Sequence, residues 1–400
     1  MDGEQIVIVV GSGASLSAGV PSTGDLTDVC IRALQAASDD ARSPDSIAAM
    51  LDHALRSENR PYDFERLLHA VEELEAYVTR SPVIKAFTEV SPKYERIADR
   101  ELLWRARRAI VGAIHGSVGG RVNDPAVLGS PATAQLDRIC AELSKQHRLV
   151  VVDFNYDDLF DRMPIEWHDG FTESSPSGNG KLFSPGDWHA AAEDSGKHLL
   201  IHMHGSVRFG YSRDFYADRR FSEPAKYATF RDAHESMQGV SLSDDTVDDK
   251  IIEASAIISG LNKGSKIIHS ARPYGYYYRT VMELLPRCRR LLVLGYGWRD
   301  LHVNTWVDEC VSLQQGALRS AVVTCRRGRD VGEQMVQDTY IRKLLGSEGW
   351  KVAQSLVYKP EADSDKIASE FKVGQQGALF AWGFVLTPDA EKALVDFMQR

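Results

Sequence analysis

Four polar side chains in this sequence stand where they could do chemistry together. Asn155 and Asp157 lie in the stretch FNYDD, His204 lies in HGS, and Asp300 lies in GYGWRD. Each stretch directly follows a short apolar run that is typical of a buried strand. An imidazole that titrates near neutrality can accept a proton from water or from a hydroxyl group. An amide can orient the reacting groups, and an ionised carboxylate can stabilise positive charge that develops nearby.

Each of these residues also has an ordinary structural explanation. Asp157 and Asp300 could each cap a helix, and Asn155 could hold a local turn. His204 could be a hydrogen-bonded core residue, which is also the role we expect for His202 one layer deeper in the same strand. Several strand ends that all carry glycine or hydrogen-bonding side chains nevertheless indicate a site more strongly than any one of them.

The N-terminal stretch IVIVVGSGASLSAGVP adds a glycine turn to this set. Residues 6–10 form an apolar run, as expected for a strand buried on both faces of a parallel sheet. Gly11 and Gly13 follow it, and glycine permits a tight turn and lets a phosphate approach the backbone amides. The stretch therefore predicts a nucleotide site, although a turn without a ligand would look the same. It departs from the ordinary dinucleotide fingerprint, because Leu16 stands at the third glycine position and residues 38–46 are a polar loop.

The apolar runs predict the fold class. They lie at residues 6–10, 149–154, 199–203, 291–295 and 321–324. Long helical or loop segments separate these runs, including a Gly/Ser/Pro-rich loop expected at 172–187 and an acidic turn at 241–249. This spacing favours an α/β fold with a Rossmann-like parallel sheet flanked by helices. Ligands of such sheets bind beyond the carboxyl ends of the strands, where the polar residues lie.

The segment between the first two predicted strands has a helical pattern. Apolar residues recur at helical spacing over residues 64–78 and again over 103–118. We therefore expect a single domain over residues 1–400, with a large helical insertion at about 24–143 and a C-terminal extension at about 326–400.

Composition excludes several classes of function. The chain has 400 residues and a net charge of −9, without a basic block, so direct binding of nucleic acid is not favoured. No apolar run approaches the roughly 18 residues that a membrane span needs, and the start MDGEQ does not resemble a signal peptide. We expect a cytoplasmic protein that binds no membrane.

The cysteines do not suggest a metal site. They are widely scattered and form no CxxC pair, which makes a four-cysteine zinc site an unfavourable interpretation. We expect buried free thiols and no bound metal at Cys30, Cys140, Cys288, Cys310 and Cys325.

Taken in chain order, the motifs GSGAS, FNYD, HGS and GYGWRD resemble those of the sirtuin-like family. Members share a glycine-alanine-serine turn, an asparagine-aspartate motif after a strand, a histidine-glycine motif and a later glycine turn. The resemblance covers four islands within residues 6–311 and implies NAD as the ligand. It implies that Asn155 and Asp157 face the nicotinamide ribose and that His204 is the catalytic base.

The resemblance also implies a set of residues around the dinucleotide. Those expected near its adenosine end belong to the later glycine turn. The full set is Gly11, Gly13, Ala14, Ser15, Gly19, Pro21, Gly205, Gly295, Tyr296 and Asp300.

The sequence departs from the protein-deacylase members of that family. Those members carry a zinc ribbon of two cysteine pairs after the histidine, and this sequence has no such pairs. The resemblance therefore points to the bacterial sirtuin-like NAD hydrolases of antiphage defence, which deplete cellular NAD. Cleavage between nicotinamide and ribose passes through an oxocarbenium-like state, and its neutral leaving group needs no acid. We expect an NAD+ glycohydrolase that gives nicotinamide and ADP-ribose.

Other functions stay open at this point. They are an NAD-dependent protein deacylase without zinc, a module that binds NAD or a related nucleotide without cleaving it, and an unrelated oxidoreductase. Members of the resembled group work beside a HerA-type ATPase, an Argonaute or a fused sensor domain. We therefore expect a homo-oligomer that is activated by a separate protein.

Overall fold

The computed structural model gives the fold of most of the chain. The residues that it describes are 5–37, 49, 51, 53, 63–80, 100–175, 180–211, 224–238, 257–259, 263, 272–314, 316–324, 339–346, 371–373, 377–381 and 385–400. The expected acidic turn at 241–249 and Cys325 lie outside these residues.

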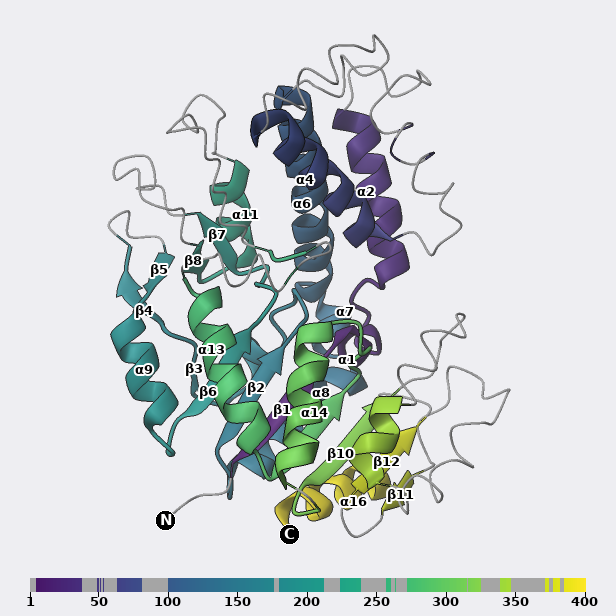
Figure 1. Cartoon of the computed structure of the whole chain (residues 1–400), viewed down its shortest axis with the longest axis vertical. Helices are drawn as coiled ribbons and strands as arrows, with labels where there is room; N and C mark the ends of the chain where they lie inside the picture. The colour runs from purple at the N-terminus through teal and green to yellow at the C-terminus, as the bar shows by residue number, and fades with distance from the viewer. Residues whose placement is uncertain are drawn as a thin grey trace.

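An eight-stranded sheet forms the centre of the fold (Figure 1). Its order is β11-β12-β10-β9-β1-β2-β6-β3, and every neighbouring pair is parallel except β11 with β12. The prediction of a Rossmann-like parallel sheet flanked by helices is thereby confirmed. The strands are β1 (Ile6–Val10), β2 (Leu149–Asp153), β3 (Trp167–His168), β6 (His198–His202), β9 (Arg290–Leu294), β10 (Arg319–Thr324), β11 (Phe371–Val373) and β12 (Gly377–Ala381).

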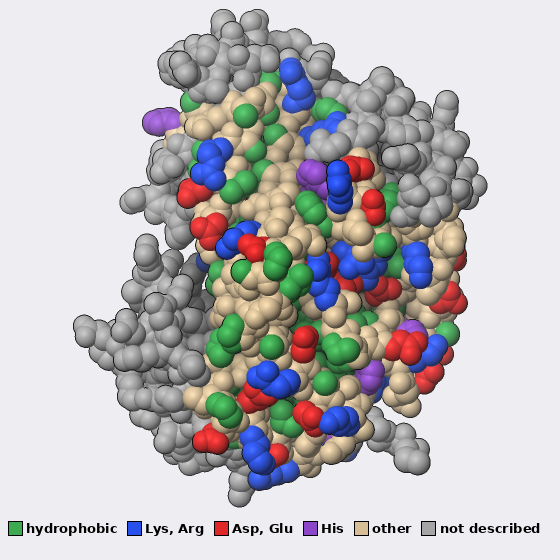
Figure 2. Space-filling model, turned by 180° about the vertical axis from the view of Figure 1, so that it is seen from behind, with side chains coloured by type: hydrophobic (Ala, Val, Ile, Leu, Met, Phe, Trp, Pro, Cys, Tyr) green, Lys and Arg blue, Asp and Glu red, His purple; other side chains and the backbone are tan. Residues whose placement is uncertain are grey.

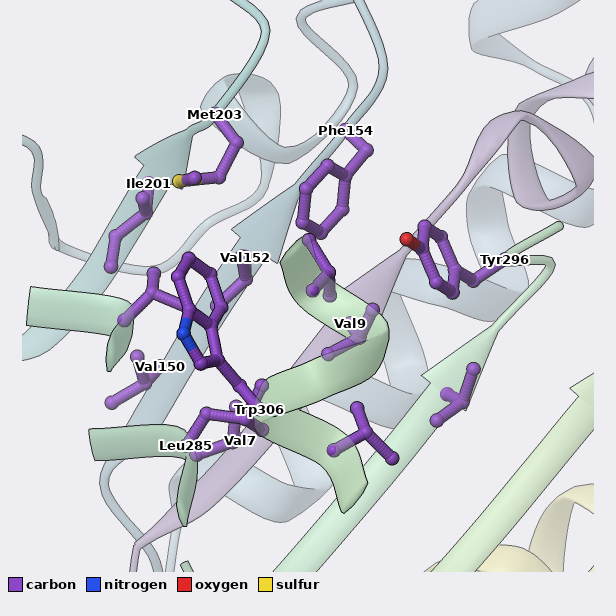
Figure 3. Packing of buried hydrophobic residues seen from close by; sticks show 14 of the residues in the cluster. Val7, Val9, Val150, Val152, Phe154, Ile201, Met203, Leu285, Tyr296 and Trp306 are labelled. Carbon is purple, nitrogen blue, oxygen red and sulfur yellow. The ribbon is translucent and has the colours of Figure 1, made fainter. Parts of the chain in front are cut away.

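Both faces of the central strand β1 are buried. Val7 and Val9 belong to one hydrophobic cluster, and Ile6, Ile8 and Val10 belong to another. This alternation follows from the two-residue period of a strand, and it explains why the run is apolar throughout. Figure 3 shows the first cluster, in which side chains of β1, β2 and β6 pack beneath the indole of a helix residue, Trp306.

Helices cover each face of the sheet. The first cluster takes side chains from α9 (Pro185–Glu193), α13 (Tyr274–Leu284), the 3₁₀ turn η4 (Leu285–Arg287) and α14 (Leu301–Gln314). The second takes them from α8 (Pro131–Ser144), the 3₁₀ turn η2 (Phe160–Arg162) and α16 (Pro388–Gln399). The sheet is therefore the middle layer of three.

Several helices lie between β1 and β2, as the sequence predicted. They are α1 (Ser12–Leu16), α2 (Thr23–Ala37), α4 (Phe64–Arg80), α6 (Arg100–Val122), α7 (Pro125–Leu128) and α8. Helices α2, α4 and α6 pack on one another around a third hydrophobic cluster and stand beyond one end of the sheet (Figure 1). Tyr156 and Val207, which follow β2 and β6, join this cluster. The three helices therefore cover the carboxyl edge of the sheet.

A second, four-stranded antiparallel sheet replaces part of a predicted loop. The expected loop at 172–187 contains most of the hairpin β4 (Phe171–Ser174) and β5 (Gly180–Phe183), followed by the start of α9. Ser184 caps α9 and accepts a hydrogen bond from the Asp187 N–H. The sheet is completed by β7 (Phe209–Tyr211) and β8 (Pro224–Tyr227), with α11 (Phe230–Gln238) packed against them.

The C-terminal residues add to the main sheet. Strand β12 pairs with β10, and α16 packs on α8. Gln135 of α8 donates to the carbonyl of Leu386 at 2.9 Å and accepts from its N–H at 2.7 Å. Arg138 adds a two-pronged ion pair with Glu391, at 2.9 and 2.8 Å.

The outer surface shows mixed charge. On the face seen in Figure 2, acidic and basic side chains are interspersed among scattered hydrophobic ones. None of the helices in the described part of the chain is both long enough and apolar enough to cross a bilayer.

Candidate active site

The ends of four parallel strands lie next to one another in the sheet. The Gly11 N–H donates to the carbonyl of Leu294 at 2.9 Å, which joins the end of β1 to that of β9. The Phe154 N–H donates to Val10 at 3.0 Å, and the Met203 N–H donates to Asp153 at 2.9 Å. The motifs that follow β1, β2, β6 and β9 are therefore gathered at one edge.

Ser15, Asn155 and Asp157 form a buried chain of hydrogen bonds. The Asn155 amide donates to the carbonyl of Gly11 at 3.1 Å and to the Ser15 hydroxyl at 3.0 Å. That hydroxyl donates to Oδ2 of Asp157 at 2.6 Å. Asn155 Oδ1 is buried and has no hydrogen-bond partner among the described residues, so its capacity to accept a hydrogen bond is unused there.

Opposing effects set the pKa of the Asp157 carboxyl group. Burial raises its pKa to about 6, although hydrogen bonds from Ser15 and from the Leu159 N–H oppose that rise. The Leu159 bond shows that Asp157 also holds a local turn, so the structural explanation and the functional one both fit this residue.

His204 lies at the end of β6 with its ring buried. Its Nδ1 is 3.1 Å from the carbonyl of Phe154. Because a carbonyl only accepts, this contact places the ring hydrogen on Nδ1 and leaves the lone pair on Nε2. Burial lowers the pKa of His204 to about 3. The imidazole is therefore neutral near pH 7, with Nε2 able to accept a proton.

Asp300 faces His204 across the edge of the sheet. Its Oδ1 lies 3.7 Å from His204 Nε2 and 3.2 Å from the ammonium group of Lys263. The Tyr296 hydroxyl donates to Oδ2 at 3.4 Å. Burial alone would raise the pKa of Asp300, but His204 and Lys263 outweigh it and lower the pKa to about 2. This residue precedes α14, as predicted, and its side chain points to the histidine.

Lys263 and Glu65 belong to this cluster and were not predicted. The Lys263 ammonium lies 2.7 Å from Oε1 of Glu65, which comes from α4. Neither residue lies in a recognised motif. Glu65 resembles any acidic residue in the first turn of a helix. A buried ion pair between segments so far apart in the chain has no signature in a single sequence.

The glycines at positions 11 and 295 allow two loops to touch. A Cβ at Gly11 would lie 2.6 Å from the Cα of Tyr296. Gly295 has a φ of +59°, and a Cβ there would lie 2.2 Å from the backbone nitrogen of Ala14. The Gly13 N–H donates to the carbonyl of Gly295 at 3.0 Å. The N–H groups of Gly11 and Gly13, assigned above to phosphate binding, are thus already paired with backbone carbonyls.

The loop between β9 and α14 is strained. Trp298 has a φ of +60°, a left-handed conformation that is rare for a large side chain. Its buried ring stacks on Tyr340 with centroids 5.0 Å apart, and the Asn304 amide donates to its carbonyl at 2.9 Å. These contacts hold the loop that ends at Asp300.

The remaining predicted residues lie around this group. Ala14 and Tyr296 are buried where the two loops meet. Gly205 adopts a φ of +85° in the turn directly after His204. Gly19 and Pro21 lie between α1 and α2, where the Gly19 carbonyl accepts from Arg121 at 3.3 Å. Among the described residues, neither is hydrogen-bonded to Asn155 or His204.

His202 takes the structural role that was expected of it. Its Nε2 lies 3.0 Å from Oδ2 of Asp161. The Lys226 ammonium bridges Asp161 and Asp169, which ties the small sheet to the main one. This second buried network lies outside the set of residues predicted to bind the ligand.

Part of the chain matches a known protein family. Residues 149–344 match the model of the SIR2-like domain. The chain therefore contains a SIR2-like domain. Such domains are in general NAD-dependent enzymes. No curated protein matches the chain.

The SIR2-like domain includes much of the candidate site. Asn155, Asp157, His204, Lys263 and Asp300 all lie inside it. Strand β1 and the glycine turn precede it in the chain, although the hydrogen bonds above join them to it. Within the described residues, no three acidic, cysteine or histidine side chains are grouped as metal ligands would be.

Proposed function

We propose that this protein is an NAD+ glycohydrolase. In the reaction, water forms a bond to the ribose carbon as the bond to nicotinamide breaks, giving nicotinamide, ADP-ribose and one proton. The observation that carries the proposal is the neutral His204, whose Nε2 lone pair lies at the same sheet edge as the Ser15-Asn155-Asp157 chain. The NAD-dependent character of SIR2-like domains supplies the substrate.

His204 is the proposed base. Its Nδ1 hydrogen is held by the Phe154 carbonyl, so Nε2 is the nitrogen that takes the proton from the attacking water. The carboxylate of Asp300, 3.7 Å away, partly offsets the repulsion that Lys263 exerts on the imidazolium that results. The proton must leave Nε2 before the next turnover.

Asn155 is proposed to orient the ribose or the water. Its amide hydrogens are fixed by Gly11 and Ser15, which leaves Oδ1 to accept a hydroxyl hydrogen. Asp157 holds Ser15 and so acts as a positioning residue, and when ionised it makes the edge favourable for positive charge on the sugar. The predicted ligand residues Gly11, Gly13 and Gly295 lie where the turn after β1 contacts the loop after β9. The carbonyl of Gly11 accepts a hydrogen bond from Asn155.

The absence of cysteine pairs favours hydrolysis over protein deacylation. The sequence has no CxxC pair that could form the zinc ribbon of the deacylase members. The proposed reaction needs neither that ribbon nor an acylated partner.

The test is release of nicotinamide from NAD by the purified protein. We expect Asn155→Ala and His204→Ala each to lower the rate about 100-fold or more. His189→Ala is the matched control, because this histidine lies on the surface of α9. Equal turnover by His204→Ala and the wild type would refute the site. Release only in the presence of an acylated peptide would indicate a deacylase, and NAD that binds but is recovered intact would indicate a sensor.

We also propose that the enzyme depletes NAD during antiphage defence. This part rests on the resemblance of the motifs, which also suggests a homo-oligomer and a separate activator such as a HerA-type ATPase or an Argonaute. The assay is therefore run with and without the product of the neighbouring gene. Light scattering that showed a strict monomer at micromolar concentration would contradict self-assembly.

A further inference from the structure

We infer that Lys263 is a positioning residue that holds the carboxylate of Asp300 and so adds to the effect of burial in opposing protonation of His204. The inference rests on the proposed function, because it concerns how the proposed base stays able to accept a proton. It assigns a role to a residue that no motif in the sequence marks.

Lys263 and His204 compete for the same oxygen. Oδ1 of Asp300 lies 3.2 Å from the lysine ammonium and 3.7 Å from His204 Nε2. The shorter contact is a charge-assisted pair, while the longer one is beyond the usual range of a hydrogen bond. Both partners and the carboxylate are largely shielded from water, so solvent does little to weaken the preference.

The position of Lys263 does not depend on Asp300 alone. Glu65 lies 2.7 Å from the same ammonium and holds it from the side of α4. A separate ion pair, Arg299 with Asp63 at 3.5 Å, joins the residue that precedes α4 to the loop before α14. The lysine is therefore held by α4 as well as by Asp300.

Loss of the lysine would make protonation of the histidine less unfavourable. Asp300 would then have His204 as its nearest cation-forming neighbour, and a proton on Nε2 would be stabilised between them. That proton would occupy the lone pair that must accept one from water. Other described groups that face His204 are His302, which also disfavours a positive charge on it, the ring of Tyr156, and the carbonyl of Phe154 on Nδ1.

Histidine NMR tests the inference without requiring activity. The pKa of His204 is measured in full-length protein labelled at histidine, with its signal assigned by loss in His204→Gln. We expect Lys263→Met to raise the pKa of His204 by about 1 or more, and Lys263→Arg to leave it close to the wild-type value. Lys343→Met is the matched control. Lys343 also pairs with an aspartate, Asp308 of α14, at 2.7 Å, but this pair lies on the surface.

The outcomes separate the inference from the proposed function. An unchanged His204 pKa in Lys263→Met would overturn the inference, whether or not NAD is cleaved. A raised pKa in a protein that never releases nicotinamide would support the contact and defeat the proposed function. In an active protein, the acid limb of the pH-rate profile should move upward with the same variant.

A second variant guards against misfolding of Lys263→Met. Asp300→Asn removes the carboxylate for which the two cations compete, and we expect it to lower the pKa of His204. Adding Lys263→Met to Asp300→Asn should then raise that pKa by less than Lys263→Met does alone, because only the direct repulsion between the lysine and the imidazolium is left to lose. A pKa of His204 that did not respond to Asp300→Asn would contradict the inference independently.

Discussion

Replacing Gly295 by alanine should break the contact between the two loops of the candidate site. Its backbone is left-handed, with a φ of +59°. The new Cβ would lie 2.2 Å from the backbone nitrogen of Ala14 and 2.5 Å from the carbonyl carbon of Gly13. These are main-chain atoms of the turn after β1, so no side-chain rotation can relieve the overlap. The turn itself must move.

Two costs add in this variant. A left-handed conformation costs an L residue about 1–2 kcal/mol, and forcing an extra carbon into packed backbone costs about 1–3 kcal/mol. We therefore expect Gly295→Ala to lose about 2–5 kcal/mol of the free energy of unfolding. Gly297 in the same loop is the matched control, because a Cβ there meets nothing within 4 Å. Gly297→Ala should be neutral or stabilise the protein by about 0.4–1 kcal/mol.

Urea unfolding followed by tryptophan fluorescence and by circular dichroism measures both variants. We expect a lower midpoint for Gly295→Ala than for wild type and Gly297→Ala. At urea concentrations where it is still folded, Gly295→Ala should also release less nicotinamide, since the turn that holds Ser15 and Asn155 has moved. Coincident unfolding curves for the two alanine variants would show that the loops do not touch as described.

Two further predictions concern stability away from that contact. Gln135→Ala leaves the N–H and the carbonyl of Leu386 without their side-chain partner. It should therefore lower the free energy of unfolding in urea by about 2–4 kcal/mol and speed proteolysis before α16. Gln399→Ala, which removes a surface hydrogen bond, should do neither. Burial raises the pKa of Asp157 to about 6 from an ordinary 3.8, so its ionisation destabilises the folded protein fully above pH 6 and not below pH 4. Relative to Asp157→Asn, the wild type should therefore lose about 3 kcal/mol between pH 4 and pH 7.5, and a constant difference would contradict the shift.

Five strands of the main sheet, β1, β2, β6, β9 and β10, were predictable because each contains a continuous apolar run. Strands β3, β11 and β12 were not predicted. A strand buried on both faces needs no polar alternation, and β1 begins and ends where its run does. The small sheet was missed for the opposite reason. Strand β4 has one buried residue followed by exposed ones, and the composition around it is typical of turns. What anchors that hairpin is the contact of Phe171 with Phe183, which the sequence does not reveal.

The candidate site was predictable as far as strand order places it. The motifs after β1 and β2 do meet, as the bonds from Ser15 to Asn155 and Asp157 show. The facing of Asp300 and His204 does not follow from strand order alone, because β1 and β2 lie between the strands β9 and β6 that precede them. Lys263 and Glu65 could not be found, because their pairing depends on how α4 packs over the sheet. The packing role of Gly295 likewise depends on a neighbour far away in the chain.

The central place of β1 has a consequence for how the chain is made. Ile6 pairs with Leu149 on one side and with Arg290 on the other. During synthesis β1 leaves the ribosome long before β9, so for most of translation one of its edges has no native neighbour. Such an apolar edge invites pairing with other nascent chains, and closing it requires contacts between very distant residues, which slows folding. Yield in cells should therefore respond to chaperone supply and to the speed of translation across the segment before β9.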